Sequence, residues 1–515
     1  MKALTISRYD QATILFIAAK FLMHLFSNTN YELHRDELLY FNMADHLSSG
    51  FATVPPLTAF LAFVSKTIFG FSVAGLRLFP ALAGALTMFI MSKIVKRIGG
   101  GVTALAIASL CFLLSPGFLL LNTLFTPNAF EQLMWTLVMW MLLRIITEEN
   151  LKLWIPAGIM LGISFMFKYS VLFLIAGFAA GFFLTRYNRL LRSGYFLTSI
   201  LAGVLIIAPN VIWQYQHNWP VVNHMSELNR TQLQDITTVI FLTDLISLNL
   251  ASTGIWLLGL ISLLFLKQEK DIRFFGISSL VTIVLFILFS GKGYYVLGLI
   301  PFLFAAGGCA MEKYLTGKLV LIRNAVLAFV IAVSAVALPT GLPLLTLESF
   351  MKYREKTVFL NIYPFYRWEG GEIHNLSQVF ADMTGWSELT GYTAAAYYML
   401  SQDEREVCTI FCERNYGYAG AINFYGRDHD LPDAVTFNES YSLWAPDTIP
   451  QGPVIYLSPD VNDMHKLFDE VTEVGSVHDP FFRESGAKVF LCREPSASVQ
   501  ELYQRIASAE KALYR

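Results

Sequence analysis

Two adjacent acidic residues, Asp36 and Glu37, offer the clearest chemistry in the sequence. They lie just beyond the first long apolar run, and an aromatic-rich stretch, 38–41, follows them. Adjacent carboxylates can bind a hard divalent cation such as Mg²⁺ or Mn²⁺, or one of them can act as a base toward an acceptor hydroxyl or amine. The alternative is the acidic first turn of a helix, which the helix dipole favours. The residues themselves leave both interpretations open.

Three cationic residues, Arg77, Lys168 and Lys292, fall at predicted helix ends on the same side of a membrane as the acidic pair. Together they could bind a lipid phosphate, because charge-assisted bonds to phosphate strengthen in a dry site. Each alone is better explained by a side chain that reaches for the membrane interface. Three of them beside an acidic pair favour a site. The glycines at 291 and 293 predict a close backbone approach around Lys292.

Asn128 and Glu131 form a third group, directly after Pro127. Proline favours the first turn of a helix, and a spacing of three places both side chains on one helix face. A glutamate inside an apolar run is costly unless it is paired or functional. We expect a functional role or a buried partner for Glu131. Lys20 and His24, one turn apart in the first apolar run, should face the helix bundle for structural reasons.

The segment 209–220 is both aromatic and polar, and it contains Trp213 and His217. Tryptophan and tyrosine here can simply form the aromatic belt of a membrane interface. The more specific alternative is that a sugar ring stacks on Trp213 and that His217 contacts an acceptor or a phosphate.

The composition indicates that the helices that position these residues lie in a membrane. The chain has 515 residues, of which 55% are hydrophobic and only 15% charged, and its mean hydropathy is +0.51. Such a chain is too apolar for a soluble enzyme of this length. A net charge of -2 gives no basic excess for nucleic-acid binding.

About eleven apolar runs before residue 343 approach the roughly 20 residues that a membrane helix needs. They lie near 9–27, 73–92, 101–121, 127–146, 153–168, 169–185, 195–210, 239–266, 273–290, 294–311 and 323–342. One assignment of the spans places most Lys and Arg residues of the loops on one side of the membrane. Because short cytoplasmic loops carry the excess of these residues, the N-terminus is expected in the cytoplasm. An odd number of spans then puts residues after 343 outside. The shorter run 57–69, after two prolines, predicts an interfacial helix within a first outer loop of about 28–72.

Two domains are predicted: a transmembrane domain, 1–342, and an extracytoplasmic α/β domain, 343–515. The second contains charges, Gly and Pro throughout, with strand-like runs at 407–411, 454–457 and 488–492. Unpaired thiols are expected for the five cysteines. A bridge from Cys412 to Cys492, if they lie on neighbouring strands, is the alternative.

The ordered motifs resemble the glycosyltransferase family 39 branch of the GT-C superfamily, which includes protein O-mannosyltransferases and is related to aminoarabinose transferases acting on lipid A. The resemblance rests on a set of segments that runs through the membrane part in order: 35–40, 50–57, 77–78, 128–131, 167–170, 209–220 and 291–295. A softer resemblance covers Gly385-Trp386 and Asn415-Tyr416-Gly417, as in the extracytoplasmic domain of bacterial members.

The resemblance implies a polytopic α-helical protein of a bacterial inner membrane that moves a sugar from a polyprenyl-phosphate carrier to an extracytoplasmic protein, lipid or glycan, with inversion. Asp36 would be the base or acceptor-orienting carboxylate, supported by Glu37. The candidates for the donor phosphate are Arg77, Lys168 and Lys292. The candidates for the sugar or acceptor are Asn128, Glu131, Tyr169, Trp213, His217, Tyr294 and Tyr295. No obligatory metal is expected, with a bound Mg²⁺ or Mn²⁺ as the alternative.

The sequence departs from the family pattern at two positions. Asn128 stands where relatives often carry Asp, and Val54 stands where they often carry a charge before Pro55-Pro56. Both departures leave the identity of donor and acceptor open. A transporter or lipid flippase is the alternative function, although its ionisable residues would lie near the membrane midplane and repeats would be visible. A non-catalytic assembly protein is a third hypothesis.

Overall fold

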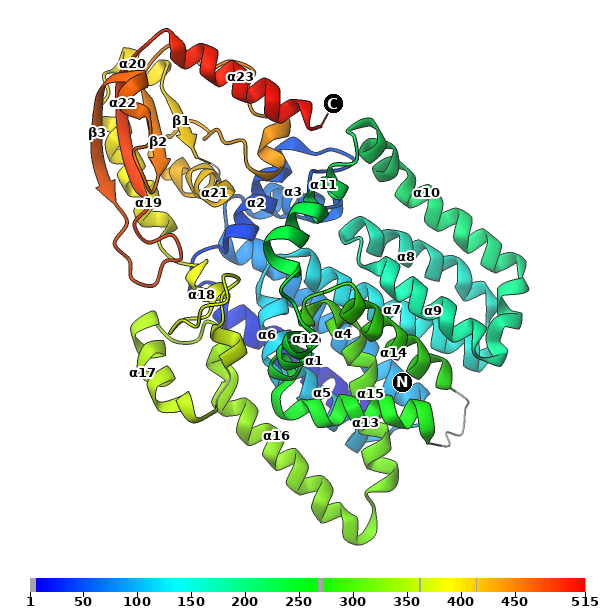
Figure 1. Cartoon of the computed structure of the whole chain (residues 1–515). Helices are drawn as coiled ribbons and strands as arrows, with labels where there is room; N and C mark the ends of the chain where they lie inside the picture. The colour runs from blue at the N-terminus through cyan, green and yellow to red at the C-terminus, as the bar shows by residue number, and fades with distance from the viewer. Residues whose placement is uncertain (1–5, 267–271, 361–362, 414, 515) are drawn as a thin grey trace, which may run out of the picture. The chain divides into compact units, whose positions relative to one another are not determined.

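The structure is a computed structural model of the chain, and it describes residues 6–266, 272–360, 363–413 and 415–514. Helices make up most of it, and four short strands form one sheet near the C-terminal end of the sequence (Figure 1). The helices of the first half of the chain are α1 (Arg8–Ser27), α2 (Arg35–Met43), α3 (Leu57–Phe69), α4 (Val73–Arg97), α5 (Val102–Leu114), α6 (Pro116–Thr123), α7 (Pro127–Glu148), α8 (Trp154–Phe167), α9 (Val171–Phe183), α10 (Gly194–Gln216), α11 (Pro220–Leu228) and α12 (Thr238–Asn249). The helices of the second half are α13 (Thr253–Phe265), α14 (Arg273–Leu288), α15 (Ile300–Tyr314), α16 (Val320–Gly341), α17 (Leu347–Thr357), α18 (Gln378–Ala381), α19 (Trp386–Tyr398), α20 (Gln402–Glu406), α21 (Tyr416–Tyr425), α22 (Met464–Leu467) and α23 (Ser498–Ala512).

Two compact units divide the chain, and each is made of three segments. The first unit contains Met1–Asn30, Arg77–Pro209 and Leu228–Ile373, and the second contains Tyr31–Leu76, Asn210–Glu227 and His374–Arg515. The predicted domain boundary after residue 342 stays a prediction.

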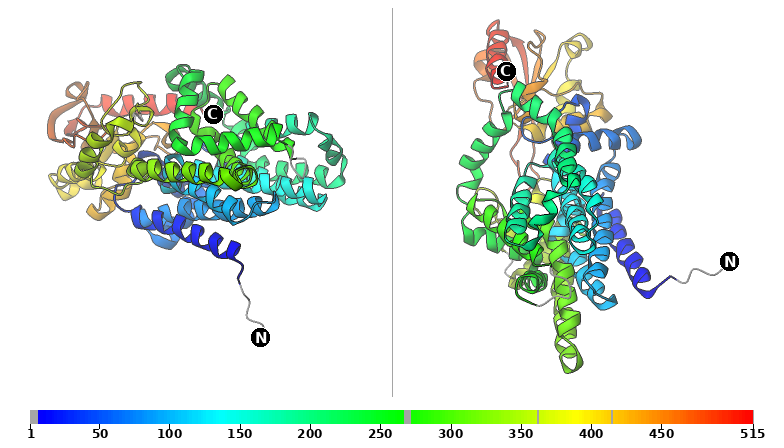
Figure 2. Two further views of the ribbon diagram at one scale, coloured as in Figure 1. Left: turned by 90° about the horizontal axis from the view of Figure 1, so that it is seen from below. Right: turned by 90° about the vertical axis from the view of Figure 1, so that its right-hand side faces the viewer.

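The first unit is a bundle of apolar helices. Helix α15 packs against α5 and α13, α9 packs against α14, and α7 packs against α8. Figure 2 gives two further views of the ribbon. Large apolar side chains such as Phe112, Phe118 and Trp135 are fully buried among them. Lys20 and His24 of α1 are also fully buried, and they contact the Phe118 carbonyl and the Thr123 hydroxyl. The expectation that these two residues face the bundle is confirmed.

Membrane-spanning segments are recognised by length and composition. Six described helices are long and apolar enough to cross a membrane, or up to eight if each of two bent helix pairs is one span. They confirm a polytopic helical membrane protein. The predicted number of about eleven stays a prediction, because several apolar runs form shorter helices, such as α14 and the segment Leu151–Phe167, that length and composition do not identify as spans. A helix, α3, occupies the predicted residues 57–69. Its position at the membrane interface stays a prediction.

The second unit contains the strands β1 (Thr409–Cys412), β2 (Val454–Ser458), β3 (Phe468–Ser476) and β4 (Lys488–Pro495). Their order in the sheet is β1-β2-β4-β3, with β1 parallel to β2 and the other neighbours antiparallel. Helix α19 packs against β2, β3 and β4. The three predicted strands are confirmed, whereas β3 was missed because this edge strand is mostly solvent-accessible and acidic.

All five cysteines are free. The alternative of a bridge between Cys412 and Cys492 is wrong, because β2 lies between their strands. Unpaired thiols, the preferred expectation, are confirmed.

Candidate active site

Helix α2 begins with a capping arrangement that uses Glu37. The His34 side chain accepts a hydrogen bond from the Asp36 backbone N–H at 3.1 Å, and the buried Glu37 carboxylate accepts one from the His34 N–H at 2.8 Å. This reciprocal pattern satisfies N–H groups that a helix start otherwise leaves unpaired. The helix-start interpretation therefore accounts for Glu37, and Asp36 remains as the carboxylate that can face a substrate.

Asp36 is oriented by a tyrosine that comes from far along the chain. The Tyr416 hydroxyl donates a hydrogen bond to Asp36 Oδ1 at 2.7 Å, and the Arg35 guanidinium lies 4.4 Å from the centre of the Tyr416 ring. Burial, and then the nearby Asp36 charge, raise the pKa of Tyr416, so this hydroxyl stays a donor. The Asp36 side chain is still 39% exposed. It is both fixed in orientation and open to a ligand.

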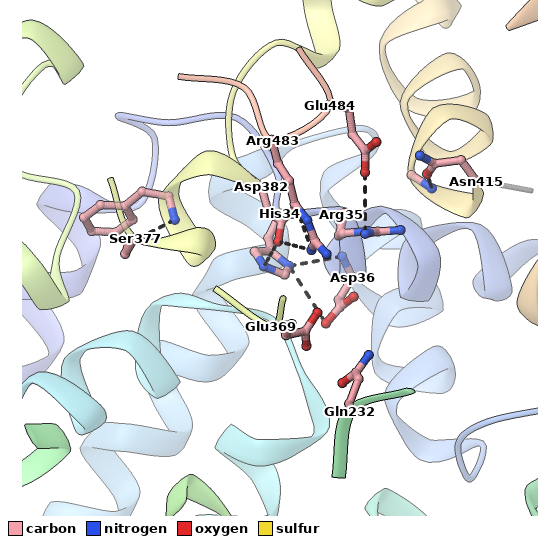
Figure 3. A network of polar contacts seen from close by, with 12 residues as sticks. His34, Arg35, Asp36, Gln232, Glu369, Ser377, Asp382, Asn415, Arg483 and Glu484 are labelled. Atoms are coloured by element: carbon pink, nitrogen blue, oxygen red, sulfur yellow. Dashed lines mark hydrogen bonds and ion pairs between the residues drawn. The ribbon is translucent and has the colours of Figure 1, made fainter. Parts of the chain in front are cut away.

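The two residues before Asp36 are also held by C-terminal partners (Figure 3). His34 Nε2 lies 3.6 Å from Asp382, which in turn pairs with Arg483 at 3.1 Å, and Arg35 lies 3.7 Å from Glu484. Burial raises the pKa of Asp382, while His34, Arg483 and Arg35 oppose that rise. Residues 34, 35 and 36 are thus each bound by a different C-terminal side chain.

Trp213 and His217 lie at the end of α10 in the same unit. Their rings stack with centroids 4.1 Å apart, and Trp213 is buried. A Cβ on Gly50 would come within 2.4 Å of the Trp213 ring, so only glycine allows this approach. The tryptophan holds the loop that follows α2, and sugar stacking on it stays a prediction.

Lys168 lies at the centre of a polar cluster in the first unit. Its Nζ atom donates to Asn128 Oδ1 at 2.6 Å and lies 3.5 Å from Glu131 Oε2, and the ring centres of Tyr295 and Tyr294 are 4.2 and 5.4 Å away. The prediction that Asn128 and Glu131 share a helix face is confirmed, because both reach one ammonium group. The expected partner for Glu131 is also present. Ser170, two residues after Lys168, donates a further hydrogen bond to Glu131.

The other two cations have separate partners. Lys292 donates to Gln232 Oε1 at 2.7 Å and to Glu369 Oε1 at 3.0 Å. The predicted close approach beside it is present, because a Cβ on Gly293 would lie 2.9 Å from the Asp244 Cβ. Lys168 therefore lies over the two tyrosine rings that follow Lys292 and Gly293 in the chain.

Arg77 is fully buried, and its Nη1 donates to the Asn28 carbonyl at 2.7 Å, at the end of α1. A cation is favourable at a helix C-terminus. The Tyr169 ring packs edge-on against Phe165 of α8, with centroids 5.0 Å apart. Phosphate binding by Arg77 and ligand binding by Tyr169 stay predictions.

Within the described residues, no group of three or more His, Cys, Asp or Glu side chains could hold a metal ion. The Glu37 Oε2 atom accepts a hydrogen bond from the His34 backbone N–H. Metal binding by the acidic pair stays untested.

Three residues around Asp36 escaped sequence reasoning as site residues: Tyr416, Asp382 and Glu439. Tyr416 belongs to the segment Asn415-Tyr416-Gly417, which resembles the extracytoplasmic domain of bacterial family members, but this resemblance implies no role for the tyrosine. Asp382 and Glu439 carry no local signal, because only the folded chain brings them to residues 34–36.

Comparisons with known proteins cover different parts of the chain. The profile of the dolichyl-phosphate-mannose-protein mannosyltransferase family matches residues 53–213. The lipid A galacturonosyltransferase RgtD of Rhizobium johnstonii (strain DSM 114642 / LMG 32736 / 3841) is 23% identical over 198 residues, which are 38% of this chain and 41% of that protein. The chain thus matches less than half the length of this relative.

Solved structures match almost the whole chain. ArnT from Cupriavidus metallidurans bound to undecaprenyl phosphate has a TM-score of 0.61 at 16% identity, over 93% of this chain and 97% of that one. The same enzyme in the apo state gives 0.60 at 14% identity, over 94% and 98%. The chain therefore has the fold of these ArnT structures. The family profile, the relative and these structures all belong to glycosyltransferases, which confirms the resemblance found in the sequence motifs and gives the transporter hypothesis no support.

Proposed function

We propose that this GT-C protein transfers a sugar from a polyprenyl-phosphate carrier to an acceptor outside the cytoplasm, with inversion at the anomeric carbon. The observation that carries the proposal is the Asp36 carboxylate, which is oriented by Tyr416 and yet open to a ligand. The family profile and the relative RgtD are of sugar transferases. The matched ArnT structure contains undecaprenyl phosphate.

In the proposed step, Asp36 orients the acceptor and takes its proton. The acceptor oxygen or nitrogen forms a bond to the anomeric carbon, and the bond from that carbon to the carrier phosphate breaks. The phosphate leaves with the electron pair and needs no proton donor. The positive charge that develops on the sugar ring is stabilised by the nearby carboxylate.

The leaving phosphate requires positive charge, and Lys168 is the leading candidate to provide it. Its side chain is 21% exposed, and its ammonium group is held by Asn128, Glu131 and two tyrosine rings. Such a preorganised cation stabilises developing negative charge without moving during the reaction. Lys292 and Arg77 are further candidates. The residues that would contact the sugar or acceptor are Asn128, Glu131, Tyr169, Trp213, His217, Tyr294 and Tyr295.

The proposal includes a location. We place the protein in a bacterial inner membrane with about eleven spans, a cytoplasmic N-terminus and residues 343–515 outside. The acceptor would then be an envelope protein, lipid or glycan. We expect no obligatory metal, so that transfer should continue after a chelator such as EDTA removes divalent cations. Loss of transfer that added Mg²⁺ or Mn²⁺ restores would contradict this expectation.

The test is incubation of the purified protein with undecaprenyl-phosphate sugars and an envelope extract, followed by mass spectrometry of the released carrier and of the acceptors. The proposal predicts that at least one donor yields free undecaprenyl phosphate and a sugar-modified acceptor. Movement of carrier lipid between leaflets without any sugar transfer would overturn it.

A further inference from the structure

Glu439 lies beside the Asp36 site and is not explained by the roles described so far. It begins a 3₁₀ helix, Glu439–Leu443, with a φ of 56°, a left-handed conformation that side-chain-bearing residues seldom adopt. Such a conformation persists only where the surroundings fix it. The structure shows what fixes it on each side.

The two neighbours of Glu439 are anchored to different parts of the site. Asn438 accepts a hydrogen bond from the backbone N–H of Tyr416 at 3.1 Å, and Tyr416 in turn donates to Asp36. Ser440 accepts one from the backbone N–H of Ala52 at 3.1 Å. Glu439 is therefore held between the Tyr416–Asp36 contact and the loop that contains Ala52 and Thr53.

The Glu439 carboxyl is only partly satisfied by the protein. Thr53 hydrogen bonds to it, whereas its Oε2 atom is buried and has no hydrogen-bond partner among the described residues. A buried polar atom without a partner is costly, and natural proteins keep such atoms mainly where a ligand or water completes them. The Gly50–Pro56 loop beside it contributes no charged side chain of its own.

The charged groups around this carboxyl have both signs. Burial raises the pKa of Glu439, and Asp36 adds to the rise, while His224 and Arg35 oppose it. Arg35 already has Glu484 and the Tyr416 ring as partners. A ligand group that donates a hydrogen bond fits beside two carboxyls, whereas a third carboxylate would be repelled.

We propose that Glu439 binds the transferred sugar through a hydroxyl or amino group and makes the Asp36 site select against uronic-acid donors. This inference rests on the proposed sugar transfer and deepens it. It assigns to the C-terminal segment a residue that discriminates between sugars, in addition to the Tyr416 contact that orients Asp36.

The test is equilibrium binding of undecaprenyl-phosphate mannose, undecaprenyl-phosphate galacturonic acid and undecaprenyl phosphate to the purified protein in detergent. We expect the wild type to bind the mannose donor at least about tenfold more tightly than the uronate donor, as one hydrogen bond to a charged group implies. In Glu439→Gln this preference should fall to about threefold or less, while affinity for undecaprenyl phosphate itself stays unchanged. The matched control is Glu470→Gln, which removes an exposed carboxylate from β3 and should keep the wild-type preference.

An unchanged preference in Glu439→Gln, or a wild type that prefers the uronate donor, would overturn the inference and leave the proposed transfer intact. A wild type that binds neither donor better than the bare carrier would also overturn the inference, while the proposed transfer would be contradicted only if no undecaprenyl-phosphate sugar released its carrier. If Glu439→Gln does not accumulate, Thr53→Val provides the same comparison, because it removes the hydroxyl that holds Glu439. It should reduce the donor preference, and no reduction would overturn the inference.

Discussion

Asp36 and Glu37 are neighbours in the sequence but have different environments. The Glu37 carboxylate closes the first turn of α2, whereas the Asp36 carboxylate points to Tyr416 and to solvent. The sequence could identify the pair, but it could not divide the roles, because the division depends on which side chain reaches back to the His34 N–H. The partner of Asp36 lies 380 residues away and could not be predicted at all.

Replacement of Tyr416 by phenylalanine removes one hydroxyl and leaves the ring against Arg35. We expect Tyr416→Phe to lower kcat by about tenfold to a hundredfold with little change in KM, because losing the hydrogen bond that orients the catalytic carboxylate costs roughly 1.5–3 kcal/mol. Steady-state kinetics on the donor measures this. Tyr456→Phe, which removes a hydroxyl bonded to Asn462 on the sheet, is the control. Equal kcat values for the two variants would contradict the orienting role.

A second prediction at this scale concerns Lys168 and its proposed binding of the carrier phosphate. We expect Lys168→Gln to weaken binding of undecaprenyl phosphate by about tenfold or more, since a charge-assisted bond to phosphate is lost. Lys168→Arg keeps the charge and should recover part of the affinity. Direct titration with undecaprenyl phosphate tests both variants. An affinity equal to that of the wild type in Lys168→Gln would remove this residue from the phosphate site and restrict it to pairing with Glu131.

At the scale of elements, the sequence was most informative where helix starts carry a local signal. Pro127 begins α7 and Pro56 precedes α3, and both helices begin at the expected residue. Strands β1, β2 and β4 followed from short apolar runs, whereas the acidic edge strand β3 has no such run. The number of spans was harder to predict, because several apolar runs form helices too short to be recognised as complete spans.

The loop after α2 depends on one close approach. A Cβ at position 50 would meet the Trp213 ring at 2.4 Å. We expect Gly50→Ala to destabilise the protein by about 1–3 kcal/mol, the usual cost of overpacking a filled interior, and to lower the apparent Tm in detergent. Gly391→Ala on α19, where an added Cβ meets nothing within 4 Å, should not lower it. If both variants melt like the wild type, Trp213 does not hold this loop.

The buried Asp382 carboxyl, which contacts His34, should make the stability of the protein depend on pH. Burial raises its pKa above the unfolded value of about 4, so the folded state binds this proton more tightly than the unfolded state does. Its contribution to the free energy of unfolding is therefore fully present below about pH 4 and is lost as the pH rises through the raised folded value. Thermal melting measured as the pH rises from about 4 should show a flatter pH dependence in Asp382→Asn than in the wild type. A steeper dependence in the variant would contradict this assignment.

At the scale of the whole molecule, composition alone established a polytopic membrane protein, and the order of motifs established the glycosyltransferase resemblance. Neither could reveal that residues 31–76 and 210–227 belong to one compact unit with the C-terminal segment. That organisation arises from long-range contacts such as those of residues 34–36 with Asp382, Glu484 and Tyr416.

The proposed orientation of the whole chain is tested with reporter fusions. Alkaline phosphatase, which folds only outside the cytoplasm, should be active when fused after Arg515, and a fluorescent reporter fused before Met1 should be bright inside the cell. This follows from the excess of Lys and Arg in the loops assigned to the cytoplasm. An inactive phosphatase fusion that accumulates normally would reverse the predicted topology.

The measurement that tests the central claim most directly is sugar transfer by Asp36→Asn. The purified variant and the wild type are compared by release of carrier from an undecaprenyl-phosphate sugar that the wild type uses, with Asp403→Asn on the exposed helix α20 as the control. We expect Asp36→Asn to insert, accumulate and bind undecaprenyl phosphate normally but to lose turnover by about a thousandfold or more, as for loss of a general base. Turnover close to that of the wild type would remove Asp36 from the mechanism and contradict this account.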